Sequence, residues 1–278
     1  MKLKLKDGPV ELTAPALMGV IDLRHTADPL AQALEMQELG ATFVELALST
    51  QAGFASAEDE LKLIVPHIAP IVEQSALYVA VNTIHPQVME AAAKAGASLI
   101  VDPNALRSPG AVDLIAKIKL PVCLVFDQHT TFDENTDPTG AVSEYLYERI
   151  DACLNAGIAR SSLLIDPTLG MQAPIEYRLK MMGRLHTFKS FALPICAPIP
   201  RIVPQPDPYL TTHPSVVTAL AIFGVDAGVS IIRTSAVGEL ALALDTWQAC
   251  TKSARPFKLS KLIVKRFLRK KKDDASAI

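Results

Sequence analysis

Residues 86–102 read PQVMEAAAKAGASLIVD and contain one complete structural unit. It starts with a helical pattern over 86–94, passes through Gly96 and continues as an apolar run over 99–102 that ends on an aspartate. Glycine commonly ends a helix because it adopts the left-handed conformation that follows the last turn. The order helix, glycine, buried strand, polar residue is therefore the repeating unit to seek in the rest of the chain.

This unit recurs along the sequence. Gly40, Gly157 and the segment 224–228 each precede a further apolar run, and four more runs of the same character complete the set. Their hydrophobicity is continuous rather than alternating, which a parallel sheet buried on both faces requires. The eight predicted strands are 16–22, 43–48, 77–82, 99–102, 122–127, 163–166, 193–197 and 229–233.

Helical patterns separate these strands. They cover residues 28–39, 58–72, 86–94, 111–118, 141–155, 174–188, 212–223 and 237–250. Strands alternating with helices in this number over about 250 residues indicate an α/β protein of the (β/α)₈ TIM-barrel class. An open, doubly wound sheet is the alternative, but no G-x-G-x-x-G motif follows the first strand.

The composition is that of a globular protein with a charged extension. Of its 278 residues 50% are apolar and 20% charged, with a formal net charge of −2, which excludes disorder, collagen and a disulfide scaffold. Residues 255–272 carry nine Lys or Arg and no acid, whereas residues 1–254 hold 18 bases against 27 acids. We therefore expect a barrel domain over 1–254 and a basic, amphipathic C-terminal tail over 255–278.

No feature of the sequence predicts export or membrane insertion. No apolar run reaches the roughly 18 residues of a membrane-spanning helix. The first seven residues alternate charge with leucine, unlike a signal peptide, and predict a short strand or a lid on the barrel. The four cysteines lie far apart without a C-x-x-C pair. We expect reduced thiols and a cytoplasmic location.

Most of the predicted strands end on polar residues. In TIM barrels the catalytic groups lie at the C-terminal strand ends and in the loops that follow, so these residues predict a polar cavity mouth. The set comprises Asp22, Arg24, His25, Ser49, Thr50, Gln51, Asn82, Thr83, Asp102, Asn104, Asp127, Gln128, His129, Asp166, Arg201, Arg233, Thr234 and Ser235. Carboxylates and imidazoles in this set also raise a metal-site interpretation, which no H-x-H or H-E-x-x-H spacing supports; we favour structural or substrate-facing aspartates.

Six segments at these strand ends resemble the motifs of one enzyme family, in the family's order. Residues 17–22 read LMGVID, 49–53 STQAG and 80–83 AVNT, and they resemble MG-(I/V)-x-N, STRPG and SVDT. Residues 93–102, 165–170 and 232–237 resemble AGADIIND, DPGIGF and LRVHDV. These are motifs of dihydropteroate synthases, and the resemblance covers roughly residues 15 to 250, nearly the whole predicted barrel.

The resemblance implies a reaction and its partners. In this family the amine of 4-aminobenzoate displaces diphosphate from the methylene group of 6-hydroxymethyl-dihydropterin diphosphate, which forms a C–N bond in folate biosynthesis. It implies a homodimer and assistance by Mg²⁺, for which Asp22 is the candidate residue. The implied catalytic residues are Asp22, Asn82 and Arg201. The implied substrate-binding residues are Thr50, Asp102, Asp166, Gly170, Arg201, Arg233 and Ser235.

The pterin pocket departs from the family pattern. Asp22, Asn82, Val101 and Arg201 stand where the family has Asn, Asp, Asn and Lys, and only Asp166 is unchanged. Asp166 keeps the carboxylate that accepts paired N–H donors of a pterin. An amide at position 82 stabilises a developing cation less than a carboxylate does, at a cost of ~3 kcal/mol, or about a hundredfold in rate. Asp22 on the neighbouring strand is a candidate for restoring that charge.

The phosphate-binding positions are also altered. Arg233 is retained, but Ser235 replaces the family's His and Gln51 the Arg of STRPG. Two interpretations therefore stay open: a divergent synthase with weak or altered activity, and a non-catalytic paralogue that binds a pterin or a partner. The tail has two interpretations as well, contact with an anionic surface such as lipid or a solubilising extension; no specific nucleic-acid binding is predicted.

Overall fold

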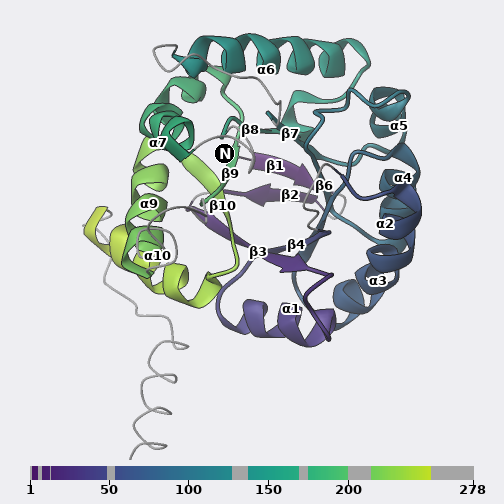
Figure 1. The fold of residues 1–278 in the computed structure, drawn as a ribbon, viewed down its shortest axis with the longest axis horizontal. Helices are drawn as coiled ribbons and strands as arrows, with labels where there is room; N and C mark the ends of the chain where they lie inside the picture. The colour runs from purple at the N-terminus through teal and green to yellow at the C-terminus, as the bar shows by residue number, and fades with distance from the viewer. Residues whose placement is uncertain are drawn as a thin grey trace, which may run out of the picture.

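The structure of the protein is a computed structural model, which describes residues 2–5, 8–12, 14–48, 54–126, 137–168, 175–199 and 214–251. Eight parallel strands form a closed barrel in the order β10-β3-β4-β5-β6-β7-β8-β9. Figure 1 shows the helices as a ring around these strands. The predicted (β/α)₈ TIM barrel is confirmed.

The barrel strands lie where the apolar runs predict them, with ends that differ by up to two residues. They are β3 (Ala16–Asp22), β4 (Phe43–Ala47), β5 (Tyr78–Asn82), β6 (Leu99–Asp102), β7 (Val122–Val125), β8 (Leu163–Asp166), β9 (Ile195–Pro198) and β10 (Val229–Thr234).

The helices follow the predicted patterns, but two patterns are divided, the helix predicted over 141–155 begins at Pro138, and that predicted over 212–223 ends at Ala227. The pattern over 58–72 is broken into α2 (Ala57–Leu63) and α3 (Val65–Gln74), because Pro66 favours the first turn of a new helix. The pattern over 174–188 divides into α7 (Ile175–Arg184) and a 3₁₀ helix over Leu185–Phe191. The others are α1 (Pro29–Glu38), α4 (Pro86–Ala95), α5 (Ala111–Ile118), α6 (Pro138–Asn155), α9 (Pro214–Ala227) and α10 (Val237–Thr251).

An antiparallel hairpin of β1 (Lys2–Leu5) and β2 (Gly8–Glu11) covers one end of the barrel (Figure 1). Leu3 and Leu5 are buried and join the apolar cluster that contains Met18 and Phe43 near the beginnings of their strands. The hairpin therefore closes the N-terminal end, as the predicted strand or lid would. The opposite end, where functional groups gather in such barrels, stays clear of it.

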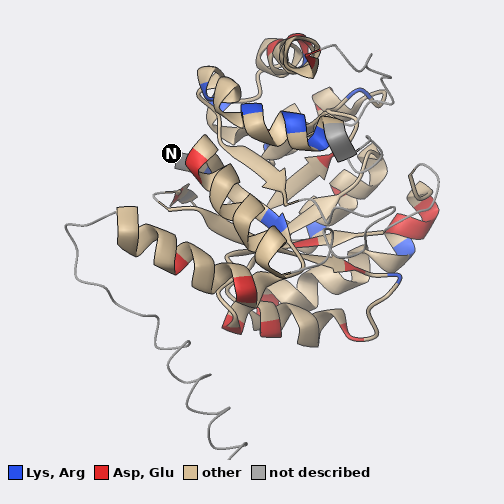
Figure 2. Ribbon diagram, turned by 60° about the vertical axis from the view of Figure 1, so that its left-hand side comes forward, with Lys and Arg blue, Asp and Glu red and all other residues tan. Residues whose placement is uncertain are grey.

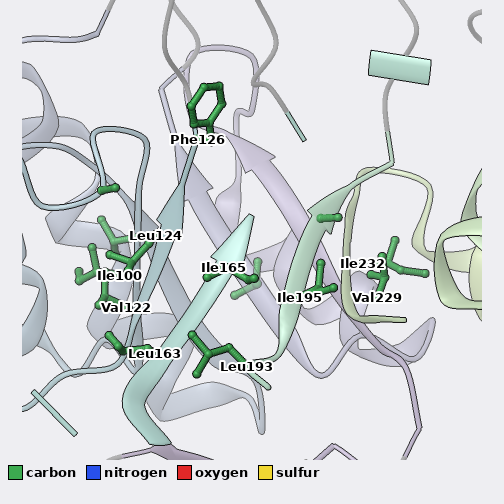
Figure 3. Packing of buried hydrophobic residues seen from close by; sticks show 14 of the residues in the cluster. Ile100, Val122, Leu124, Phe126, Leu163, Ile165, Leu193, Ile195, Val229 and Ile232 are labelled. Atoms are coloured by element: carbon green, nitrogen blue, oxygen red, sulfur yellow. The ribbon is translucent and has the colours of Figure 1, made fainter. Parts of the chain in front are cut away.

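Alternate strand residues fill two separate cores. Side chains such as Leu99, Val101, Cys123 and Leu164 belong to the cluster inside the barrel. Their sequence neighbours, for example Ile100, point outward and pack beneath the helices (Figure 3). This parity shows which polar residues at the strand ends face the interior, because successive strand side chains point to opposite faces.

Glycine ends the helices as the repeating unit predicts. Gly96 follows α4 with a φ of 102°, and its amide bonds to carbonyls of the last turn. A side chain at this φ is strained, so glycine is the favoured residue. Gly40, Gly157 and Gly228 also have positive φ.

Helix α1 depends on its capping residue. The Asp28 carboxylate accepts a hydrogen bond from the backbone N–H of Ala31 at 2.9 Å. We expect Asp28→Ala to lower the free energy of unfolding by about 1 kcal/mol, since a first-turn amide loses its partner. Urea denaturation measures this, with Asp28→Asn as the control that keeps a capping oxygen. Equal losses in both variants would contradict the capping role.

Charged residues lie mainly on the outer helices, and the strands are uncharged over most of their length (Figure 2). The few charged residues on barrel strands are therefore candidates for function. Cys123, Cys153 and Cys196 are buried, Cys250 is exposed, and all four are free thiols. Within the described residues no helix is long and apolar enough to cross a membrane. The tail over 255–278 lies outside the described residues.

Candidate active site

Four polar side chains meet inside the barrel at its C-terminal end. They are Glu45 on β4, Asn82 on β5, Asp166 on β8 and Arg233 on β10. Each lies two residues after a side chain of the interior cluster, so strand alternation turns it inward. Residues 188 positions apart in the chain are thereby brought into contact.

Arg233 holds this group together. Its Nε donates to Glu45 Oε2 at 2.6 Å, its Nη2 to Glu45 Oε1 at 2.7 Å and its Nη1 to Asp166 Oδ2 at 3.0 Å. Burial by itself lowers the pKa of Arg233, but the two carboxylates outweigh it and the pKa is raised. The paired arrangement with Glu45 uses the planar donor geometry that lysine lacks.

Asn82 completes the contacts of Glu45. Its Nδ2 donates to Glu45 Oε1 at 2.7 Å, so this oxygen accepts from an amide and from a guanidinium. A carboxylate at position 82 would have no N–H to donate to Glu45, and the two negative charges would repel each other. The amide that replaces the family's aspartate is thus matched to its neighbour, and a carboxylate lies directly behind it.

Asp166 is fixed from two sides. Its Oδ1 accepts from the backbone N–H of Thr168 at 3.0 Å and from the Thr168 hydroxyl at 2.5 Å, and Oδ2 accepts from Arg233. Arg178 on α7 is 4% exposed; burial lowers its pKa, and the charge of Asp166 opposes this effect. Two carboxylates and two guanidinium groups therefore lie near one another, with no net charge among Glu45, Asp166, Arg178 and Arg233.

Asp22 lies at the end of β3, four residues after the inward-facing Met18, so its side chain lies on the inner face of the sheet. Its side chain is 29% exposed, and its Oδ2 is 3.8 Å from Nε2 of His25. Oδ1 accepts from the backbone N–H of Arg24 at 3.1 Å. Asp22 is thus a partly exposed carboxylate beside the interior group, in keeping with its predicted position at the mouth.

Asp102 lies on the other side of the sheet. It follows the inward Val101, faces outward, and accepts from the backbone N–H groups of Asn104 at 2.7 Å and Leu106 at 2.9 Å. Burial raises its pKa to about 6. The structure gives Asp102 a role in fixing the turn after β6 and directs it away from the interior where we predicted substrate binding, because the residue facing inward is its neighbour.

The remaining predicted site residues divide into two groups. Ser235 follows β10, two residues after the inward-facing Arg233, and is exposed. Thr50, Gly170 and Arg201 lie outside the described residues, as do Asp127 and His129. Their predicted roles in binding and catalysis stay predictions.

Two members of the charged group were not singled out from the sequence. Glu45 carried a signal, because it is the one acid in the apolar strand FVELA and shares the parity of Phe43. Arg178 carried none, since it is one of several basic residues in 175–184 and only the packing of α7 buries it.

The carboxylates at this end of the barrel are the candidates for holding a resident metal ion. Among the described residues no three His, Cys, Asp or Glu side chains come together in a way that could hold one. Of the described acidic residues at this end, Glu45 and Asp166 are paired with Arg233, and Asp22 lies at the end of β3 with His25 3.8 Å away. These residues do not fit a Mg²⁺ ion held by protein ligands, so no chemical step is assigned to one.

A closed parallel barrel with a buried charged group at its C-terminal end has the form of a TIM-barrel enzyme. Comparison with known proteins narrows this class. A family model described as pterin binding enzyme matches residues 20–235. The chain is 32% identical over 214 residues to dihydropteroate synthase of Escherichia coli strain K12, covering 70% of this chain and 76% of the relative. The chain therefore belongs to the pterin binding enzyme family.

Other relatives and solved structures agree. The dihydropteroate synthase of Haemophilus influenzae is 26% identical over 271 residues, which are 90% of this chain and 98% of the relative. The structure of Xanthomonas albilineans dihydropteroate synthase in complex with 7,8-dihydropteroate superposes with a TM-score of 0.81 at 28% identity, covering 92% of this chain and 100% of that one. The expected synthase-like transferase agrees with these relatives, which are dihydropteroate synthases.

Proposed function

We propose that this protein is a dihydropteroate synthase that joins 6-hydroxymethyl-dihydropterin diphosphate to 4-aminobenzoate. The observation that carries the proposal is Asp166, the retained pterin-binding aspartate, which faces the interior and is fixed by Thr168 and Arg233. The complex of the Xanthomonas albilineans synthase with 7,8-dihydropteroate, whose fold this chain shares, supports it.

Asp166 recognises the pterin in this proposal. The 2-amino-pyrimidinone edge presents paired N–H donors, and a carboxylate accepts both in a charge-assisted contact. A carboxylate offers about four lone-pair sites, and Thr168 and Arg233 already donate three hydrogen bonds to Asp166, so the paired N–H groups of the pterin replace at least one of them.

The substitution needs negative charge near the reacting carbon, because positive charge develops there. The amine nitrogen forms a bond to the methylene carbon, the bond from that carbon to the diphosphate oxygen breaks, and the amine releases a proton to solvent. Positive charge grows on the pterin as diphosphate leaves. Asn82 presents an amide. Glu45 on β4 lies 2.7 Å from its nitrogen but is paired with Arg233, and Asp22 ends β3, on the other side of β4. Because Arg233 already balances the charge of Glu45, we assign the missing carboxylate charge to Asp22, and the binding of diphosphate to Arg201 with Arg233.

A second function has a specific observation in its favour. Val101 is fully buried among apolar side chains where the family has an asparagine, so one pterin contact is absent. A non-catalytic protein that binds a pterin or a partner would tolerate this loss. The homodimer, the cytoplasmic location and the role of the basic tail stay predictions beside either function.

Purified protein incubated with the pterin diphosphate and labelled 4-aminobenzoate tests the choice. We expect labelled dihydropteroate and an equal amount of diphosphate, with turnover at least a hundredfold lower in Asp166→Asn, because an amide cannot accept two N–H donors as a carboxylate does. Pterin binding without turnover would support the non-catalytic function. The absence of both would contradict the synthase and a pterin-binding protein alike, and would favour a protein that binds a partner.

A further inference from the structure

A second buried group lies outside the barrel, behind the end of β5. Glu60 on α2 is 4% exposed and Thr83 is 1% exposed. The Thr83 hydroxyl donates to Glu60 Oε2 and accepts from the backbone N–H of His85, at 3.0 Å in the latter case. Its hydrogen-bonding capacity is thus used on both sides, which fixes the rotamer of this side chain.

The same group reaches two neighbouring segments. Nε2 of His85 is 2.8 Å from the carbonyl oxygen of Ala55, at the entry to α2. The backbone N–H of Thr83 donates to the carbonyl of Val101 on β6 at 3.1 Å. The first turn of α2, the end of β5 and the adjacent strand are therefore held together around Thr83.

Strand alternation connects this group to the site. Asn82 points inward to Glu45, and the next residue, Thr83, points outward to Glu60. A backbone rotation at the end of β5 moves both side chains at once. From Asn82 the contacts continue to Glu45 and on to Arg233, so the outer group is connected to the interior charges through two consecutive residues.

Glu60 is poised to change its charge near neutral pH. Burial raises its pKa to about 7, the Thr83 hydrogen bond and the charge of His85 act in the lowering direction, and Asp102 raises it further. Among the described residues, the titratable groups that act on Glu60 are thus His85, which precedes α4, and Asp102, which ends β6. The other charged residues of α2, Glu58, Asp59 and Lys62, are exposed.

We propose that Glu60 and Thr83 are positioning residues that set the orientation of the Asn82 amide from outside the barrel. The kinetic part of this inference rests on the proposed function. The structural part does not, because it concerns the coupling of two side chains on consecutive residues.

The structural part is tested by the side-chain amide resonances of Asn82, assigned from their loss in Asn82→Leu. We expect them to shift with pH in the wild type with a midpoint near 7. Glu60→Gln keeps an acceptor for Thr83 and removes the charge, so the shift with its midpoint near 7 should vanish. Glu58→Gln, on the exposed face of the same helix, should leave it unchanged. A shift that persists in Glu60→Gln, or none in the wild type, would overturn the coupling.

The kinetic part compares matched pairs at Thr83 and Glu60. Thr83→Val and Glu60→Leu remove the hydrogen bond, and we expect kcat to fall about tenfold with KM for 4-aminobenzoate little changed. Thr83→Ser and Glu60→Gln keep the bond and should restore kcat. Equal activity in all four variants would contradict positioning. If the wild type forms no product, the proposed function fails, and the resonance shift decides the coupling alone.

Discussion

Replacing Arg233 by alanine should give the largest loss of stability of any single change in the barrel interior. Glu45 and Asp166 are each about 1% exposed in their side chains, and without the shared cation each must stay charged in a buried position or take up a proton, either of which costs free energy. Removing one partner of a buried ion pair typically costs about 3–5 kcal/mol, because the remaining charge stays buried and unpaired. Denaturant unfolding followed by circular dichroism measures the change.

A surface pair provides the control for this prediction. Arg107 pairs with Glu148 at 3.1 Å, and both side chains are partly exposed. We expect Arg107→Ala to cost less than about 1 kcal/mol, as is usual for exposed ion pairs. Adding Glu45→Gln to Arg233→Ala should recover part of the loss, since one unpaired charge is then removed. Similar losses at Arg107 and Arg233 would contradict a buried, mutually dependent group.

The second large effect is a dependence of stability on pH. The pKa of Glu60 is raised in the folded protein from 4.5 to about 7, so the folded state binds more protons than the unfolded state between these values. The free energy of unfolding therefore falls as pH rises from about 4.5 to 7 and stays lower above pH 7. The shift corresponds to a fall on the order of 3 kcal/mol.

Glu60→Gln should remove this dependence and stabilise the protein at pH 8. Urea unfolding between pH 4.5 and 8 measures it, and the exposed Glu58→Gln should keep the wild-type profile. A smaller fall between about pH 4 and 6 should survive in Glu60→Gln, because burial raises the pKa of Asp102 from 3.8 to about 6. A profile in Glu60→Gln that matches the wild type would show that Glu60 does not titrate in this range.

The fold was predictable because its unit is local. A helix, a glycine and an apolar run lie within 17 residues in 86–102, and alternation of helices and strands implies the closed barrel. The break at Pro66 and the 3₁₀ end of α7 were missed, since helical spacing continues across both. The outward direction of the Asp102 side chain was not predicted for another reason. A position at the end of a strand does not by itself show on which face of the sheet a side chain lies.

The site was predictable where residues keep the family's type. Asp166 and Arg233 were identified from motifs, and the structure brings them together at 3.0 Å. Glu45 and Arg178 are defined by partners far away in the chain, which no local pattern reveals. The sequence shows at Asn82 only that an amide stands where the family has an aspartate. The hydrogen bond from Asn82 to Glu45 gives this replacement a physical reason.

The proposed function depends most on Asp166 as the residue that receives the pterin. Calorimetric titration with 6-hydroxymethyl-dihydropterin diphosphate tests it directly, comparing the wild type with Asp166→Asn and with Asp113→Ala, which changes an exposed carboxylate on α5. We predict binding to the wild type and to Asp113→Ala, and a loss of at least a hundredfold in affinity for Asp166→Asn. Equal affinity for all three proteins would contradict the account.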